Sequence, residues 1–170
     1  MDTRDLYPHE ILQEAIGKSC AKSEFSIKML VILSFLGGGY VGFGYLACLR
    51  VISGIPAEWN GLAALLGASV FPIALICILI GGGELATGNM MIMALGKLTG
   101  RVSTYKLVRN WLIVSLGNLA GAVAMAYFLG HYVGLAEGAA AAKTIAIAEA
   151  KVNMDFGRAF VSAIACNWMV

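Results

Sequence analysis

Long uncharged runs, separated by short charged segments, dominate the pattern of hydrophobic and polar positions along the chain. Met29–Leu49 lies between Lys28 and Arg50, and Trp59–Gly83 and Trp111–Gly130 are two further uncharged runs. Each run is about as long as, or longer than, the roughly 20 apolar residues with which an α-helix crosses a bilayer core. The pattern therefore predicts three membrane-spanning helices.

A fourth uncharged run begins at Ala159 and includes the twelve residues from there to Val170. Twelve helical residues do not reach across a bilayer core. We therefore expect this sequence to be a fragment of a longer protein, cut in the middle of its fourth span.

The second run is interrupted by the stretch GGGELATGNMM, which covers Gly81–Met91. Glycines weaken a helix, and a glutamate is costly in the bilayer. Trp59–Gly96 is too long for one straight crossing and too short for two crossings with a turn. Irregular backbone at membrane depth must face protein or a water-filled path, because unpaired N–H and C=O groups cost several kcal/mol each. The sequence thus predicts one crossing that is broken at its glycines, with Leu85–Gly96 as a short continuation.

Each residue type in this stretch suggests a part in such a break. Gly81, Gly82 and Gly83 release the helix, and Glu84 is expected to accept hydrogen bonds from freed N–H groups or from a neighbouring helix. Broken helices often form substrate sites, so Thr87 is a candidate hydroxyl for a passing anion. Gly88 and Asn89 are expected to allow a tight return of the chain, and Asn89 is expected to cap the short helix that follows. A kink used only for packing, with Glu84 as a structural acceptor, is the alternative.

Small residues in the first and third spans predict close packing of helices. Gly117 and Gly121 form a GxxxG pair in the stretch NWLIVSLGNLAGA, and Gly38 and Gly42 are spaced in the same way. Such pairs let two membrane helices approach closely. Asn118 lies beside the first pair and is interpreted as a residue that hydrogen-bonds between helices rather than as a ligand.

The basic residues predict the orientation of the chain. The loop Lys97–Arg109 contains four basic residues and no acid, whereas the segment Arg50–Glu58 contains one basic residue. Since basic loops stay in the cytoplasm, we expect this loop and the N-terminus to be cytoplasmic, the latter because it contains Arg4, Lys18, Lys22 and Lys28. The Ala-rich segment 131–158 then lies outside as a helical connection. Residues 7–28 are typical of an amphipathic surface helix or of an ordinary polar lead-in helix.

Composition agrees with a membrane protein and excludes several functional classes. Hydrophobic residues make up 59% of the chain and charged residues 13%, and the mean hydropathy is +0.81. A net charge of +2 does not suggest a nucleic-acid partner. The four cysteines form no CxxC pair and the two histidines have no ligand-like spacing, so we expect no metal and no cofactor. No nucleophile–base pair indicates an enzyme.

Three blocks together resemble one known family. GGGELATGN follows an apolar run, RNWLIVSLGNLAGA lies in the next span, and Lys151 precedes the Asn167 of CNWMV. Their order and spacing, from about Ile11 onward, resemble the formate/nitrite transporter family. The resemblance implies an all-α, aquaporin-like bundle of six membrane helices, of which this chain would cover helices 1–3 and the start of helix 4. It implies a cytoplasmic N-terminal helix in residues 1–28, a channel domain in residues 29–170, and a homopentamer in a bacterial cell membrane.

The resemblance also implies roles for single residues. Gly81–Asn89 would be an omega-type loop that breaks the second span, with Thr87 as its pore-facing hydroxyl. Lys151 would make a central chamber electropositive, and Asn167 would help to hold the centre of the pore. Apolar constrictions would be formed by Phe71, Leu75 and Leu85. The family often has an aromatic residue at the position of Ala86, and its central histidine belongs to a half of the protein that this chain does not include.

The predicted function is a channel or proton-coupled carrier for small weak-acid anions such as formate or nitrite. An anion crosses hydrocarbon at high cost, and its neutral acid crosses at much lower cost. An aquaporin-like channel for neutral solutes is an alternative, although the Asn-Pro-Ala signature is absent. A membrane-anchor subunit of a respiratory enzyme is another, although no histidine for haem lies in the predicted spans. An inert structural membrane protein is the third.

Overall fold

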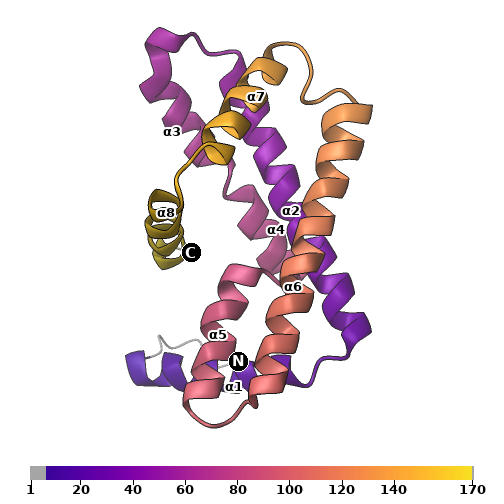
Figure 1. The fold of residues 1–170 in the computed structure, drawn as a ribbon, viewed down its shortest axis with the longest axis vertical. Helices are drawn as coiled ribbons and strands as arrows, with labels where there is room; N and C mark the ends of the chain where they lie inside the picture. Colours follow the sequence, from indigo (N-terminus) through magenta and orange to yellow (C-terminus); the bar gives the residue numbers. More distant parts are fainter. Residues whose placement is uncertain (1–6, 170) are drawn as a thin grey trace.

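The computed structural model describes residues 7–169, which form helices joined by short connections (Figure 1). The predicted N-terminal segment before Tyr7, with its Arg4, and the last residue, Val170, lie outside the described residues. The helices at the N-terminal end and through the spans are α1 (Pro8–Ser23), α2 (Ile27–Ser53), α3 (Asn60–Val70), α4 (Ile73–Gly81), α5 (Ala86–Leu98) and α6 (Thr104–Met125). They are followed by a π-helix (Ala126–Tyr132), α7 (Ala139–Val152) and α8 (Phe156–Met169).

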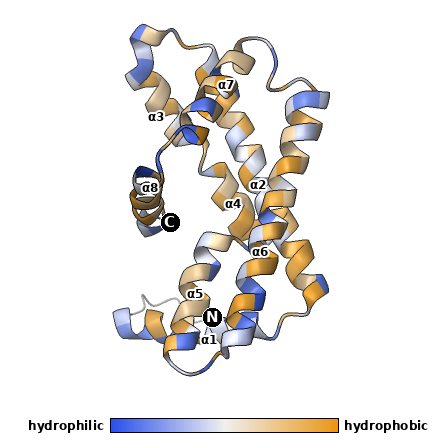
Figure 2. Ribbon diagram, in the orientation of Figure 1, coloured by the Kyte–Doolittle hydropathy of each residue, from blue (hydrophilic) through white to orange (hydrophobic). Residues whose placement is uncertain are grey.

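Three segments are long and apolar enough to cross a membrane: Ile27–Ser53, Ala57–Gly81 and Thr104–Tyr132. They coincide with the three spans predicted from the uncharged runs; the first and third are longer than predicted, and the second is shifted by two residues toward the N-terminus. Hydrophobic residues run along α4 and α6, and many of their side chains are exposed (Figure 2). Leu79 and Ile80 of α4, for example, are 83% and 84% exposed. Such surfaces fit a chain surrounded by lipid or by further helices.

The first and third spans, α2 and α6, pack directly against each other (Figure 1). A Cβ built on Gly38 would lie 2.0 Å from the backbone oxygen of Asn118, and one on Gly121 would lie 2.0 Å from the backbone oxygen of Phe35. A Cβ on Gly117 would lie 1.9 Å from the hydroxyl of Ser34. The close helix packing predicted from the glycine pairs is thus confirmed, because only glycine fits at these contacts.

The second span contains a further interruption, which was not predicted from the sequence. It consists of α3 and α4, which are separated by a turn at Phe71 and Pro72. Proline has no N–H and collides with the carbonyl four residues earlier, so a helix cannot run straight through this position. The prediction of one helix from Trp59 to Gly83 is therefore wrong in this detail. Both halves pack against α2.

The N-terminal helix α1 is confirmed as a helix and packs against α5 and α6. It begins with proline at its first position, and the Glu10 carboxylate accepts a hydrogen bond from the Tyr7 N–H at 2.8 Å. The buried Ser19 of α1 lies so close to Gly96 of α5 that a Cβ on Gly96 would be 2.3 Å from the Ser19 Oγ. One face of α1 is therefore fixed against the bundle. Its position at a bilayer surface stays a prediction.

The predicted helical connection between the third and fourth spans is confirmed as α7, which packs against α2. Gly134 and Gly138, at φ +83° and +62°, form the turns before it. The π-helix at the end of the third span was not predicted. The last helix, α8, is exposed along its described length and lies beside α5 at the middle of the molecule.

Candidate functional site

The second span is interrupted where its glycines stand. Helix α4 ends at Gly81, residues Gly82–Leu85 have no regular structure, and α5 begins at Ala86. Gly82 has φ +79°, a backbone conformation that favours glycine. The expected loop Gly81–Asn89 is therefore too long: Thr87, Gly88 and Asn89 are helical and provide no tight return. The omega-type shape of the break stays a prediction.

Two neighbouring helices form hydrogen bonds with the backbone of the break at Glu84 and Ala86. The Glu84 N–H donates to the Leu33 carbonyl of α2 at 3.0 Å. The Ala86 N–H donates to Asn118 Oδ1 of α6 at 2.8 Å, and Asn118 Nδ2 donates to the carbonyls of Ser34 and Glu84 at 2.7 and 2.8 Å. Asn118 is thus confirmed as an interhelical hydrogen-bonding residue. The irregular backbone is possible here because it faces protein.

The carboxylate of Glu84 is buried, with the residue 5% exposed, and both of its oxygens have partners. Oε1 forms an ion pair with the ammonium of Lys22 on α1, and Oε2 accepts from Asn89 Nδ2 at 2.6 Å. Asn89 Nδ2 also donates to Asn110 Oδ1 of α6 at 2.9 Å. Glu84 was expected to accept hydrogen bonds from freed N–H groups or from a neighbouring helix; its partners Lys22 and Asn89 were not predicted. A buried carboxylate generally needs a cation, and that was the signal for such a partner.

Asn89 does not cap α5 as expected. The N-cap residue is Leu85, which has no side-chain cap hydrogen bond. The Ala86 N–H at the first position of α5 is instead satisfied by Asn118 from another helix. Asn89 lies one turn into α5, where it is buried and holds Glu84 and Asn110 together. A local capping rule could not foresee this arrangement, since the partner of the helix end comes from a distant part of the chain.

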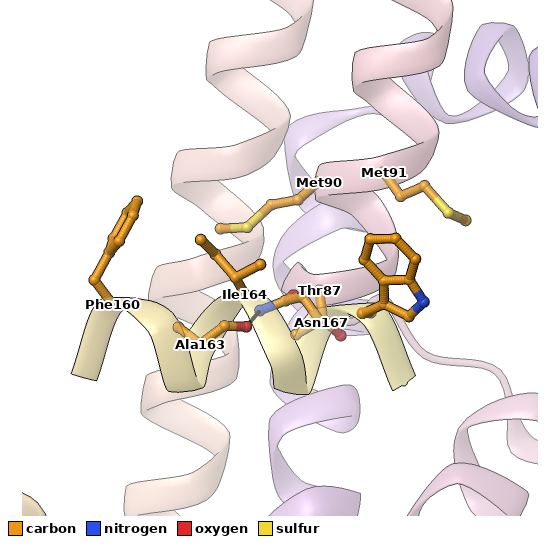
Figure 3. A pocket seen from close by; sticks show the side chains of 8 residues that line it. Thr87, Met90, Met91, Phe160, Ala163, Ile164 and Asn167 are labelled. Atoms are coloured by element: carbon orange, nitrogen blue, oxygen red, sulfur yellow. Dashed lines mark hydrogen bonds between the residues drawn. The ribbon is translucent and has the colours of Figure 1, made fainter. Parts of the chain in front are cut away.

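Two of the predicted pathway residues, Thr87 and Asn167, line the same groove between α5 and α8 (Figure 3). The groove has a volume of about 460 Å³, and its other walls are mainly apolar: Met90, Met91, Phe160, Ala163, Ile164 and Trp168. The Thr87 hydroxyl is buried and has no hydrogen-bond partner among residues 7–169. Asn167 Nδ2 donates to the Ala163 carbonyl at 2.8 Å. A buried hydroxyl without a partner is unusual, and it is consistent with a group that binds a ligand.

The start of α5 adds a favourable electrostatic environment to this groove. The first hydrogen bond of the helix runs from the Asn89 N–H to the Leu85 carbonyl at 2.9 Å. The N–H groups of Thr87 and Gly88 therefore precede the helical hydrogen-bond ladder. The partial positive charge at the N-terminus of a helix favours anions within its first turn.

The remaining predicted residues do not line this groove. Lys151 is exposed in the last turn of α7. Phe71, Leu75 and Leu85 are partly buried, and the Phe71 ring meets the Tyr45 ring edge-on with 6.3 Å between their centroids. Their roles in a chamber and in constrictions stay predictions.

Comparison with known proteins identifies the family. Residues 9–170 match the sequence model described as formate/nitrite transporter. The chain belongs to the formate/nitrite transporter family. The resemblance found in the three sequence blocks is thereby confirmed, and the family is one of membrane transporters rather than enzymes.

Several relatives in this family are similar to most of the chain. An uncharacterized transporter, YrhG, of Bacillus subtilis is 46% identical over 96% of this chain and 62% of its own length. Formate channel BtFdhC of Bacillus thuringiensis is 37% identical over 96% of this chain and 63% of its own length. A probable formate transporter of Methanothermobacter thermautotrophicus is 38% identical over 91% of this chain and 64% of its own length. The chain thus spans less than two thirds of each.

A solved structure supports the fold. An FNT family ion channel superposes with a TM-score of 0.67 at 25% sequence identity, covering 74% of this chain and 50% of that protein. The all-helical arrangement with its membrane spans is therefore that of this channel family.

Proposed function

We propose that the full-length protein is a membrane channel or proton-coupled carrier for small monovalent weak-acid anions such as formate or nitrite. The observation that carries this proposal is the buried hydroxyl of Thr87, which has no partner in the part of the chain that the structure describes and lines a groove at the start of α5. The names of relatives such as formate channel BtFdhC support the class of substrate. Because the chain spans less than two thirds of these relatives, the proposal concerns the whole protein.

In this proposal the anion is first attracted by charge and then held by hydrogen bonds. Lys151 would supply an ammonium near one entrance, since its side chain is exposed at the end of α7. The Thr87 hydroxyl and the free N–H groups of α5 would then bind the carboxylate or nitrite oxygens. Asn167 lines the same groove and would orient the bound anion from α8. Apolar neighbours such as Met90 and Ile164 disfavour a hydrated ion.

Proton transfer would make the apolar parts of the path passable. Phe71, Leu75 and Leu85 would form constrictions that admit the neutral acid more readily than its anion. The proton donor would be a group in the part of the protein beyond this chain. In this proposal the N-terminus is cytoplasmic, and five subunits assemble into a pentamer in which each subunit has its own pore.

Uptake of labelled formate and nitrite by liposomes containing the full-length protein tests the proposal. Thr87→Val removes the hydroxyl and keeps the shape, so we expect uptake to fall by at least about ten-fold, as for loss of one charge-assisted hydrogen bond. Thr144→Val is the matched control, because its hydroxyl donates only to Ala140 within α7. Lys151→Gln should weaken uptake at low salt more than at high salt. Equal uptake by the wild type and Thr87→Val would show that the groove is not the pathway.

A further inference from the structure

A second groove lies at the other end of α5, between α1 and the turn that joins α5 to α6. Its volume is about 520 Å³, and it is lined by Gln13, Ile16, Gly17, Cys20, Thr99 and Arg101. A Cβ built on Gly17 meets no atom within 4 Å, so the groove is open along α1. It shares no lining residue with the groove at Thr87. It is therefore a separate candidate site at the end of the molecule where α1 lies (Figure 1).

The backbone holds Arg101 firmly at this groove. Gly100 has φ +72°, its N–H donates to the Lys97 carbonyl at 3.1 Å, and the Arg101 N–H donates to the Gly96 carbonyl at 2.9 Å. This pair of hydrogen bonds is the Schellman pattern at a helix end. The next residue, Val102, is 2% exposed and fixes the turn in the core. The guanidinium thus extends from a well-defined backbone.

Positive charge predominates around the groove. Arg101 is exposed, and within residues 7–169 its guanidinium forms no hydrogen bond or ion pair. Among the described residues, none with a carboxylate lines the groove. Lys18 directly follows the lining residue Gly17, and Lys97 lies two residues before Thr99; both are exposed. One exposed carboxylate, that of Glu14, follows the lining residue Gln13, so basic residues remain in excess around the groove. Arginine binds phosphate through two parallel hydrogen bonds, so a phosphate group is the chemistry that this site fits.

Exposed apolar side chains around the groove favour a lipid phosphate over a dissolved one. Leu98, directly before the lining residue Thr99, is 83% exposed. Leu12 lies one helical turn before Ile16 and is 47% exposed. A dissolved phosphate would leave these side chains in water, whereas a phospholipid covers them with its acyl region.

We propose that this groove binds the phosphate of an anionic phospholipid from the leaflet that contacts α1. Arg101 pairs with the phosphate, Lys18 and Lys97 add to the attraction, and the acyl region covers Leu98 and Leu12. The lipid joins α1 to the end of α5 and so fixes the N-terminal helix at the membrane surface. The proposal does not depend on which anion the protein transports.

Native mass spectrometry of the full-length protein with equimolar phosphatidylglycerol and phosphatidylcholine tests the site. We expect the wild type to retain phosphatidylglycerol preferentially. Arg101→Gln removes the charge, and Gly17→Leu adds a side chain to the groove at a position where a Cβ meets no atom within 4 Å; each should lower the preference by about five-fold. The matched controls are Arg50→Gln, at the other end of α2, and Gly61→Leu, where a Cβ also meets no atom within 4 Å. The controls should keep the preference.

Three outcomes would overturn the proposal. The first is an unchanged preference in Gly17→Leu, which should fold because leucine has a higher helix propensity than glycine. The second is an equal loss in Arg50→Gln, which would indicate general surface charge. The third is displacement of phosphatidylglycerol by an equal concentration of inorganic phosphate, which would show that the groove binds free phosphate. Retention of the preference in Arg101→Lys, with a normal melting temperature, would support the charge itself as the cause.

Discussion

The ammonium of Lys22 on α1 forms an ion pair with the carboxylate of Glu84, which lies 62 residues later in the break of the second span. The Lys22 side chain is 21% exposed and the Glu84 side chain 7%. The N-terminal helix therefore supplies the cation that pairs with Glu84, in the break that precedes Thr87. This contact connects the N-terminal helix to the candidate anion site.

Lys22→Met should destabilise the protein, because it leaves a buried carboxylate without its cation. We expect a loss of about 2 kcal/mol, below the roughly 3–5 kcal/mol of a fully buried pair, because Lys22 is partly exposed. Unfolding of the detergent-solubilised full-length protein measures this loss. Lys18→Met is the control, because Lys18 is exposed and no ion pair of its side chain occurs within residues 7–169.

The double variant Lys22→Met, Glu84→Gln separates a charge effect from a packing effect. Once Glu84 is neutral, loss of the cation should cost little, so the two substitutions should not be additive. Additive losses would contradict the role of the ion pair.

Asn118→Leu should disrupt the break itself. The Asn118 side chain satisfies the Ala86 N–H and the Glu84 carbonyl, and both lose a partner in this variant. We expect a loss of about 2–4 kcal/mol, together with reduced anion uptake. Asn153→Leu, at the exposed end of α7, should have little effect on either measurement. Unchanged uptake in a folded Asn118→Leu would show that the position of α5 does not matter for transport.

Gly38→Ala and Gly61→Ala should act in opposite directions. A methyl group at Gly38 would lie 2.0 Å from the Asn118 backbone oxygen, so α2 and α6 would have to separate. We expect a loss of about 3 kcal/mol or failure to fold. At Gly61 the methyl meets no atom within 4 Å, and alanine should stabilise α3 by about 0.5–1 kcal/mol. Melting temperatures of the two variants provide the comparison, and a stable Gly38→Ala would contradict the observed helix contact.

The pair between Glu24 and Lys106 should make stability depend on pH in the acid range. The hydrogen bond from Lys106 and its positive charge hold the pKa of Glu24 below its ordinary value of 4.5. A carboxyl with a lowered pKa stabilises the fold above its unfolded pKa, and the effect disappears as the pH falls through the folded pKa. Lys106→Gln should therefore be less stable than the wild type at pH 6, with the difference shrinking below about pH 4.5. A difference that stays constant down to pH 3 would exclude this pair as the cause.

Hydropathy and small residues predicted most of the fold. The uncharged runs located three spans, because the bilayer requires a continuous apolar helix of set length. Gly117 and Gly121 indicated the contact of α2 with α6, since only small residues allow it. Pro72 could also have predicted the turn between α3 and α4, because proline lacks an N–H and interrupts a helix. The π-helix at Ala126–Tyr132 had no comparable signal.

The sequence by itself determined that this chain is a membrane protein with a broken second span, because hydropathy and glycine act locally and need no partner. Only the tertiary structure decided what holds the break: Lys22 from α1 and Asn118 from α6. It also decided that Thr87 and Asn167 share one groove. Hydrogen bonds and ion pairs depend on distances of a few ångströms between residues far apart in the chain, and spacing along a sequence does not define those distances.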